Sequence, residues 1–230
     1  MLFGIEWNTS NEWAFAWSIL PILLRGLWVT LQAAAVGFLL AALLGLILAA
    51  MKSARLRLIR WPAKLISEFL RDTPLLAQLF FLYYVLPDYG IVLPAFMTGA
   101  LALGLQYSAY MSEVYRAGIE AVPRGQGDAA RALDLTPGRT FIDIVIPQAL
   151  PRIIPALGNY LVSITKDVPI LSVVSILDML GVAKIIGDRS FNYLVPLTLV
   201  GVLYLLLTLL SAALIRRLDQ RLPKQGIPLR

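Results

Sequence analysis

The feature that most constrains this chain is a set of apolar segments that are long enough to cross a lipid bilayer. A helix needs about 20 mostly apolar residues to cross the roughly 30 Å hydrocarbon layer. Five segments meet this requirement: 27–51, 63–86, 91–113, 151–177 and 193–215. Hydrophobic residues make up 59% of the chain and charged residues only 15%, which excludes an ordinary soluble domain. The sequence therefore predicts an all-α integral membrane protein, with residues 1–230 forming a single domain of five transmembrane helices.

The basic residues predict which side of the membrane each connection faces, because Lys and Arg concentrate in cytoplasmic loops. Three alternate segments hold 15 of the 20 basic residues: 52–64, 116–152 and 216–230. The opposite connections carry only Arg25, Lys184 and Arg189. We therefore expect the N-terminus outside and the C-terminus in the cytoplasm. The net charge of +6 reflects this topology and does not indicate nucleic-acid binding. An aromatic belt at the outer interface is predicted for Trp7, Trp13, Phe15 and Trp17.

Several kinds of chemistry are excluded by the residues that the chain lacks. It has no cysteine and no histidine, which removes disulfides, thiol nucleophiles, imidazole bases and the usual zinc ligands. It also has no GxxxxGK[ST] stretch, so any nucleotide hydrolysis must come from another chain. We expect no catalytic site, no metal site and no cofactor on this chain.

The first apolar segment carries small residues at every fourth position. They are Ala33, Gly37, Ala41, Gly45 and Ala49. Such a stripe lines one helix face and lets another backbone approach closely. Alanine and glycine are common in membrane helices in any case, but the regular spacing favours a tight helix contact.

The longest polar connection, 116–150, is predicted to contain a short helix that begins near Arg124. Thr136 and Pro137 then read as the N-cap and first position of a new helix. Ten helical residues span only about 15 Å, too short to cross a membrane. With an apolar stripe on one side and charges elsewhere, the helix suits a socket on a soluble partner, although a solvated loop is an equal alternative on composition alone. The candidate contact residues are Arg124, Gly125, Asp128, Ala129, Ala130, Arg131, Leu133 and Asp134.

This connection resembles the cytoplasmic loop signature of the inner-membrane permease subunits of binding-protein-dependent ABC importers. That signature is E-A-A, three residues, G, nine residues, I-x-L-P. The chain has Asp128-Ala129-Ala130, then Asp134 at the glycine position, then Ile144-x-Ile146-Pro147, so the spacing fits throughout. Asp134 is the main departure, and aspartate is among the few residues that tolerate a left-handed helix end.

Three further stretches resemble the branch of these permeases that imports polar amino acids and related zwitterions. They are EFLRDTPLLAQLFFLYY (68–84), SAYMSEVYRAGIEAVPRGQGDAARAL (108–133) and LGNYLVSITKDVPILSVVSI (157–176). Within that branch, the segments LFFLYYVLPDYGIVLP and AKIIGDRSFNYLVPLTLVG are most similar in sequence to permeases for ectoine and hydroxyectoine.

The resemblance implies a type I ABC importer permease in a bacterial inner membrane. It implies four partners: an ATP-binding cassette ATPase that carries ATP and Mg, a second permease that is identical or homologous, an extracytoplasmic substrate-binding protein, and the lipid bilayer. The short cytoplasmic helix would couple ATP hydrolysis to alternating access. An ATP-independent channel or secondary transporter for small solutes is the alternative, but it does not explain a short cytoplasmic helix that is suited to docking in a partner protein.

Ionisable residues inside an apolar segment suggest a substrate pathway, because charge in contact with lipid is costly. Lys166 and Asp167 fall near the middle of the fourth segment, and Pro169 weakens the helix after them. The alternative is that the span ends before Thr165 and the pair sits at the outer interface. Asn159 and Gln106 are weaker candidates for this pathway. In the second segment, Lys64, Glu68 and Arg71 are spaced for a helical charge ladder.

Overall fold

The computed structural model describes residues 11–222, and all regular structure in that range is helical. The α-helices and the shorter π and 3-10 helices (η) follow one another along the chain. They are α1 (Glu12–Lys52), α2 (Arg57–Asp72), α3 (Leu75–Phe80), η1 (Phe81–Val85), η2 (Leu86–Tyr89), α4 (Ala95–Glu120), α5 (Arg124–Ala132), α6 (Pro137–Arg139), η3 (Thr140–Val145), α7 (Ile146–Asp167), η4 (Val168–Val174), α8 (Met179–Ser190) and α9 (Leu194–Arg221).

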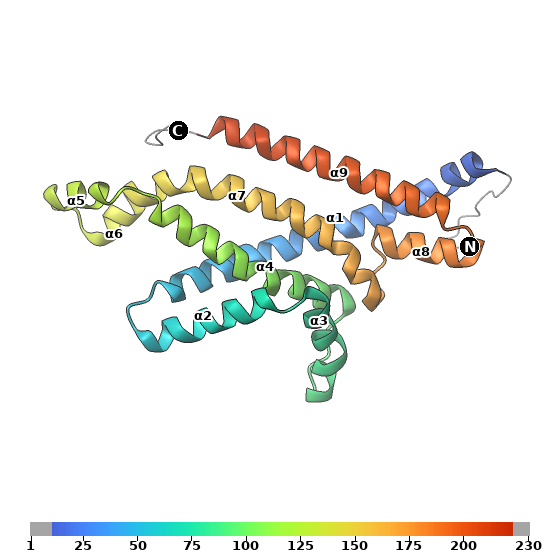
Figure 1. The fold of residues 1–230 in the computed structure, drawn as a ribbon, viewed down its shortest axis with the longest axis horizontal. Helices are drawn as coiled ribbons and strands as arrows, with labels where there is room; N and C mark the ends of the chain where they lie inside the picture. The colour runs from blue at the N-terminus through green and yellow to red at the C-terminus, as the bar shows by residue number, and fades with distance from the viewer. Residues whose placement is uncertain (1–10, 223–230) are drawn as a thin grey trace.

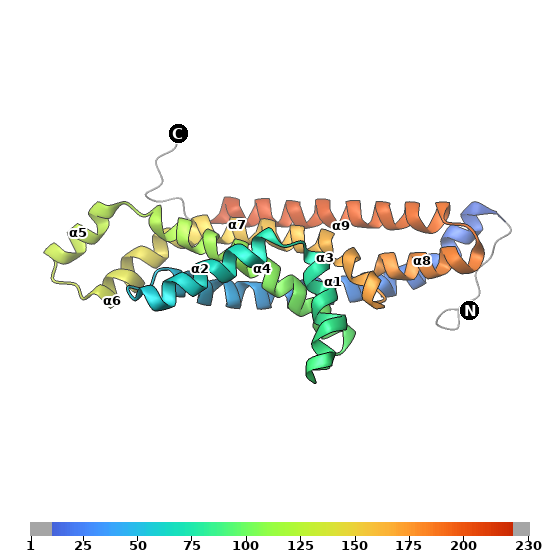
Figure 2. The ribbon, with the colours of Figure 1, turned by 60° about the horizontal axis from the view of Figure 1, so that its bottom comes forward.

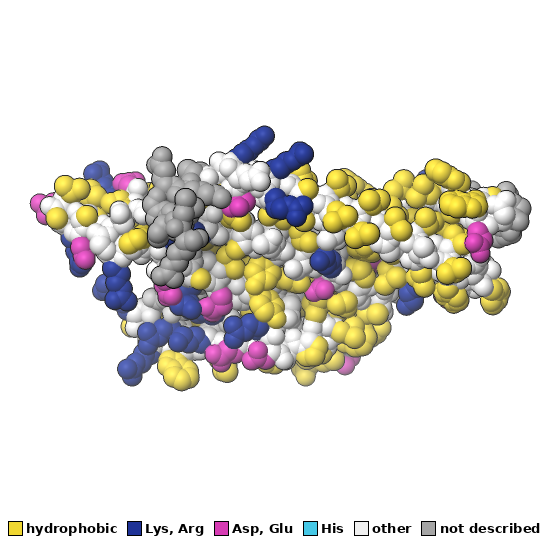
Figure 3. Space-filling model, turned by 45° about the horizontal axis from the view of Figure 1, so that its top comes forward, with side chains coloured by type: hydrophobic (Ala, Val, Ile, Leu, Met, Phe, Trp, Pro, Cys, Tyr) yellow, Lys and Arg dark blue, Asp and Glu magenta, His cyan; other side chains and the backbone are white. Residues whose placement is uncertain are grey.

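The long helices run side by side along the longest dimension of the molecule (Figure 1). Helix α5 lies at one end, and the start of α1 lies with α8 at the other. The segment from α3 to η2 projects crosswise from the bundle, as a second view confirms (Figure 2). Charged side chains gather over the half of one face that carries α5, and hydrophobic ones dominate the opposite half (Figure 3).

Within the described residues, three helical stretches are both long and apolar enough to cross a membrane: Glu12–Lys52, Pro137–Val174 and Leu194–Arg221. The first is longer than the predicted span 27–51, because Phe15, Ile19 and neighbouring apolar residues extend the helix and pack in a cluster with α8 and α9. A chain of five spans remains a prediction.

The predicted span 63–86 is divided into two helices at Thr73-Pro74. Thr73 is extended (φ −99°, ψ 140°), as expected for a residue that precedes proline. Helix α2 ends there and α3 leaves in another direction (Figure 2). The next predicted span, 91–113, corresponds to α4, which starts at Ala95 and continues to Glu120. Arg71, Asp72 and Pro74 mark this break in the sequence, but the apolar run after Pro74 favoured a single span.

The stripe of small residues forms the predicted tight contact, between α1 and α4. All five stripe residues are buried. A Cβ at Gly45 would lie 3.0 Å from the Met111 Cβ and 3.0 Å from the Ser108 carbonyl oxygen. On the facing helix, a Cβ at Gly104 would lie 2.7 Å from the Leu40 Cβ. The two backbones therefore approach so closely that glycine is required on both sides.

The aromatic residues near the N-terminus divide into two groups. Trp13 and Trp17 are largely exposed, as an interfacial belt requires, but Phe15 is buried in the cluster shared with α8 and α9. Phe15 therefore belongs to the core and not to the belt. Trp7 and the basic tail residues Lys224 and Arg230 lie outside the described residues.

Candidate functional site

Helix α5 stands at the end of the molecule, away from the main bundle (Figure 2). It starts directly after Pro123, and the predicted second start follows it: the Thr136 side chain accepts a hydrogen bond from the Arg139 amide at 3.4 Å, with Pro137 at the first helical position. The sequence therefore predicted both helix starts correctly.

Asp134, at the glycine position of the loop signature, is left-handed with φ 55°. The chain ends α5 with the Asp134 amide donating to the Arg131 carbonyl at 3.0 Å and the Leu135 amide donating to the Ala130 carbonyl at 3.0 Å. These bonds satisfy carbonyls that a helix end would otherwise leave unpaired. Aspartate thus performs the turn that glycine performs in the signature.

The two faces of α5 differ in their exposure. Ala130 is fully buried against its own chain, whereas Leu133 is 73% exposed and Ala129 is also exposed. Asp128 and Arg131 form an ion pair on the exposed side, where such pairs contribute little. Of the predicted contact residues, Ala130 therefore holds α5 in place, and Leu133 is the large apolar side chain available to a partner.

Three glycines of this region have no packing role within the described chain. A Cβ at Gly125, Gly127 or Gly138 would meet nothing within 4 Å. Glycine inside a helix costs roughly 0.5 to 1 kcal/mol relative to alanine. The two glycines of α5 therefore weaken the helix and allow no closer packing within the described chain. This favours a requirement for glycine in the contact with a partner.

A second polar site lies between α4 and α7 in the apolar part of the bundle. It is a pocket of about 220 Å³, lined by Leu75, Gln106, Tyr107, Tyr110, Tyr160, Ser163 and Asp167. The rings of Tyr110 and Tyr160 stack with their centroids 5.9 Å apart, and Tyr107 meets Tyr160 edge-on at 6.0 Å. The pocket lining holds one carboxylate and no basic side chain.

The carboxylate is held in place by a tyrosine. Tyr107 donates its hydroxyl hydrogen to Asp167 at 2.7 Å. The Gln78 amide nitrogen lies 2.6 Å from the Gln106 side-chain amide and donates to the Thr73 hydroxyl at 2.7 Å. These bonds tie the pocket to the break between α2 and α3. An ammonium or guanidinium group could pair with Asp167 and lie against the tyrosine rings.

The predicted pathway residues separate into two pairs. Gln106 and Asp167 line the pocket, whereas Lys166 and Asn159 are exposed and do not line it. Helix α7 runs through to Asp167 and continues as a 3-10 helix to Val174, so it does not end before Thr165. Among residues 11–222, no group of three His, Cys, Asp or Glu side chains could hold a metal ion.

Sequence reasoning missed the tyrosines of this site. Tyr160, Ser163 and Asp167 are spaced three and four apart and so share one face of α7. Tyr107 and Tyr110 are spaced in the same way on α4. That spacing was visible in the sequence, but only the structure shows that the two faces meet.

Comparison with known proteins relates the whole chain to transporter subunits. Residues 37–224 match the family described as "Binding-protein-dependent transport system inner membrane component". The chain is 64% identical, over the full length of both proteins, to a probable amino-acid ABC transporter permease, y4tG, of Sinorhizobium fredii. It is 34% identical to the arginine transport system permease ArtQ of Bacillus subtilis, over 88% of this chain and 93% of that protein.

Solved structures give the same relationship. A crystal structure of an amino acid ABC transporter with histidines has a chain that is 36% identical, with a TM-score of 0.84, covering 88% of this chain and 94% of that one. An inward-facing structure of the MetNI methionine ABC transporter matches with a TM-score of 0.74 at 18% identity, covering 89% of this chain and 98% of that one, which supports the fold alone.

Proposed function

Because the chain belongs to the family of binding-protein-dependent transport system inner membrane components, we propose that it is the permease subunit of an ATP-driven importer of polar amino acids or related zwitterions. The observation that carries the proposal is α5, which matches the family's loop signature and presents Leu133 at the end of the molecule. This end would face the cytoplasm, with the N-terminus outside.

Helix α5 would dock in a socket on an ATPase subunit that supplies ATP and Mg. The exposed Leu133 would fill an apolar pocket of that partner, and Gly125 and Gly127 would let its backbone come close. Ala130 would hold α5 against η3, so that a displacement of α5 moves α7 with it. A second permease and an extracytoplasmic binding protein would complete the importer.

The tyrosine-lined pocket would hold the substrate during passage. Its carboxylate, Asp167, would bind a positively charged group of the substrate, and the tyrosine rings would stabilise that charge further. Ser163 and Gln106 supply the other polar groups of the lining, although the Ser163 hydroxyl donates to the Asn159 carbonyl at 3.2 Å. This arrangement suits an amino acid with a cationic side chain; ectoine, a zwitterion with a delocalised positive charge, is a second candidate.

Uptake in reconstituted vesicles tests the energy source. The permease, its ATPase and the binding protein should accumulate labelled amino acid only when hydrolysable ATP is present. Uptake that persists without ATP would favour a channel or secondary transporter. Parallel assays with arginine, glutamine and ectoine would identify the substrate.

Substitution of Leu133 tests the docking. Leu133→Glu should abolish copurification with the ATPase, because the socket would have to bury a carboxylate. Leu133→Met, which keeps an apolar side chain of similar volume, should preserve it. Membrane insertion should be normal in both variants, since Leu133 is exposed. Normal copurification of Leu133→Glu would contradict the docking role.

A further inference from the structure

A polar cavity lies at the end of the bundle where α1 stops, apart from both sites described above. It has a volume of about 560 Å³ and is formed by the last turn of α1, by α2 and by α4. All of its lining residues are charged or hydroxylated: Lys52, Ser53, Arg60, Lys64, Ser67, Glu68, Arg71, Glu113, Arg116 and Glu120.

Part of this charge is neutralised inside the cavity. The buried Lys52 ammonium lies 2.9 Å from a Glu113 carboxylate oxygen. Arg116 lies 2.9 Å from the other oxygen of Glu113 and 2.5 Å from Glu120. Two cations and two anions are thereby matched, so this set of four gives the cavity no net charge.

The remaining charge of the cavity comes from α2, and it is positive. On α2 the lining holds one carboxylate, Glu68, and three basic side chains, Arg60, Lys64 and Arg71. The predicted ladder of Lys64, Glu68 and Arg71 is not formed: Arg71 lies 3.9 Å from Asp72 instead. Throughout residues 11–222, no carboxylate lies within 4 Å of Arg60 or Lys64. The cavity therefore presents two cations outside any ion pair, Arg60 and Lys64, against one carboxylate, Glu68.

The same helix carries an apolar face directly beside its charged residues. Leu58, Trp61, Leu65 and Phe69 follow each other at helical spacing and are between 61% and 87% exposed. Each of the last three lies one position after Arg60, Lys64 or Glu68, so this face adjoins the cavity wall. A tryptophan between basic and apolar residues is typical of a helix at the membrane interface.

We propose that this cavity binds the phosphate headgroup of an anionic phospholipid in the cytoplasmic leaflet, with the acyl chains along the apolar face of α2. The inference rests on the proposed orientation, in which the α5 end faces the cytoplasm. Arg60 and Lys64 supply the donors for the phosphate oxygens. A free phosphate compound would use the same cations but would make no contact with Leu58, Trp61 and Leu65. The apolar face therefore favours a lipid as the occupant.

Quenching of Trp61 fluorescence by brominated lipids tests the proposal directly. Trp61 is made the only tryptophan of the full-length chain by replacing the other four with phenylalanine. The protein is placed in phosphatidylcholine vesicles that contain equal fractions of either brominated phosphatidylglycerol or brominated phosphatidylcholine. The anionic lipid should quench with an association constant roughly fivefold higher.

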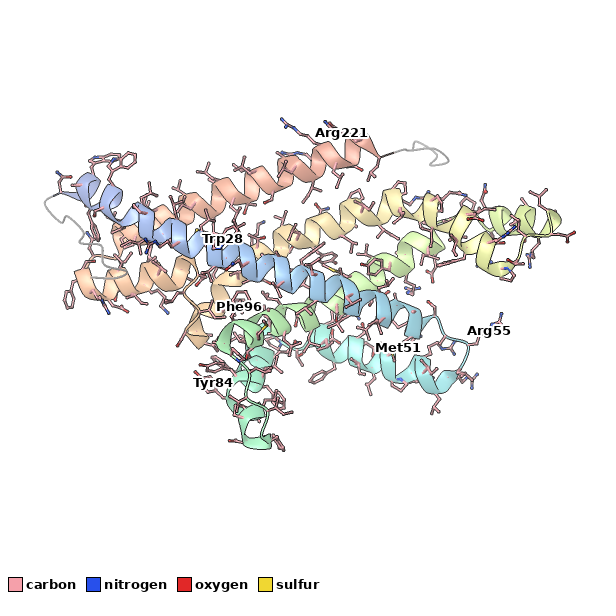
Figure 4. The ribbon with its side chains drawn as sticks, turned by 180° about the vertical axis from the view of Figure 1, so that it is seen from behind. Trp28, Met51, Arg55, Tyr84, Phe96 and Arg221 are labelled. Atoms are coloured by element: carbon pink, nitrogen blue, oxygen red, sulfur yellow. The ribbon has the colours of Figure 1, made fainter. Side chains whose placement is uncertain are left out.

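A matched pair of double variants locates the effect. R60Q/K64Q should reduce the ratio of the association constants for the anionic and the neutral lipid to near one. R55Q/R57Q removes the same charge from residues that do not line the cavity, and it should retain most of the preference for the anionic lipid. Arg55 lies in the loop between α1 and α2 and points away from the bundle (Figure 4). Thermal unfolding of R60Q/K64Q should match the parent, because neither side chain has an ion pair to lose.

Three outcomes would overturn the proposal. They are the absence of any preference for the anionic lipid, an equal loss in both double variants, which indicates diffuse surface charge, and full competition by soluble glycerol phosphate, which indicates a free phosphate ligand. The measurement needs neither ATP nor a partner chain. A failed transport assay would therefore leave it unaffected, and a failed quenching assay would leave the transport function standing.

Discussion

The Tyr107 hydroxyl on α4 donates a 2.7 Å hydrogen bond to the Asp167 carboxylate at the end of α7. This bond joins two helices across the pocket and orients its only negative charge. A hydrogen bond to a charged group contributes about 1.5 to 3 kcal/mol to stability. The pocket therefore depends on this pair for the position of its carboxylate.

Replacing Asp167 with asparagine should raise the KM for a cationic amino acid by more than tenfold, because the charge that pairs with the substrate is lost. Tyr107→Phe should have a smaller effect, because the carboxylate remains but is no longer oriented. Uptake measured over a range of substrate concentrations checks both expectations. Lys166→Gln is the control, since this neighbour is exposed and does not line the pocket. A normal KM in Asp167→Asn would remove the pocket from the transport pathway.

Alanine at Gly104 should destabilise the α1–α4 contact. The new methyl group would lie 2.7 Å from the Leu40 Cβ, and overpacking of this kind costs typically 1 to 3 kcal/mol. Gly201→Ala is the matched control, because a Cβ there meets nothing within 4 Å and the gain in helix propensity is the same. Thermal unfolding in detergent should show a lower melting temperature for Gly104→Ala alone. Equal behaviour of the two variants would contradict the close approach.

The parts of this structure that were predictable are those with a local signal. The four-residue spacing from Ala33 to Ala49 identified a helix contact, since spacing determines which residues share a face. Thr136-Pro137 identified a helix start, and the loop signature located the left-handed turn at Asp134. Each of these features is set by a few residues that are neighbours in sequence.

The parts that were missed depend on how helices meet. The cationic Lys52 was assigned to a basic loop, yet it is buried between α1, α2 and α4. The tyrosines of the pocket lie on two helices that are far apart in sequence, so neither helix alone indicated a site. Arg71, Asp72 and Pro74 were visible in the segment 63–86, but the strongly apolar residues after Pro74 favoured a single span. Tertiary packing determined all three results.

The ion pair between Lys52 and Glu113 should respond unequally to the loss of either partner. The Lys52 side chain is 4% exposed and that of Glu113 is 36% exposed. Glu113→Gln leaves the buried ammonium with neutral acceptors only, among them the Ser67 and Ser112 hydroxyls, and should cost about 3 kcal/mol. Lys52→Met leaves Glu113 with Arg116 and with solvent, and should cost less. Thermal unfolding of the two variants ranks them, and the reverse order would contradict the buried position of Lys52.

The Asp178 carboxylate, at the N-cap of α8, is a buried titratable group. It lies between η4 and α8, is fully buried, and accepts hydrogen bonds from the Gly181 amide at 2.9 Å and the Tyr204 hydroxyl at 3.2 Å. Burial raises its pKa to about 6, although the hydrogen bonds oppose the increase. The folded protein therefore holds this proton more tightly than the unfolded chain does.

A raised pKa in the folded state means that protonation of Asp178 stabilises the fold. This contribution is complete below the ordinary pKa of an aspartate and is lost as the pH rises through about 6. The chain has no histidine to titrate in the same range. The melting temperature should therefore rise by a few degrees between pH 7 and pH 5. Asp178→Asn keeps a good N-cap for α8 and should remove the dependence. A variant that follows the parent's pH profile would show that another group is responsible.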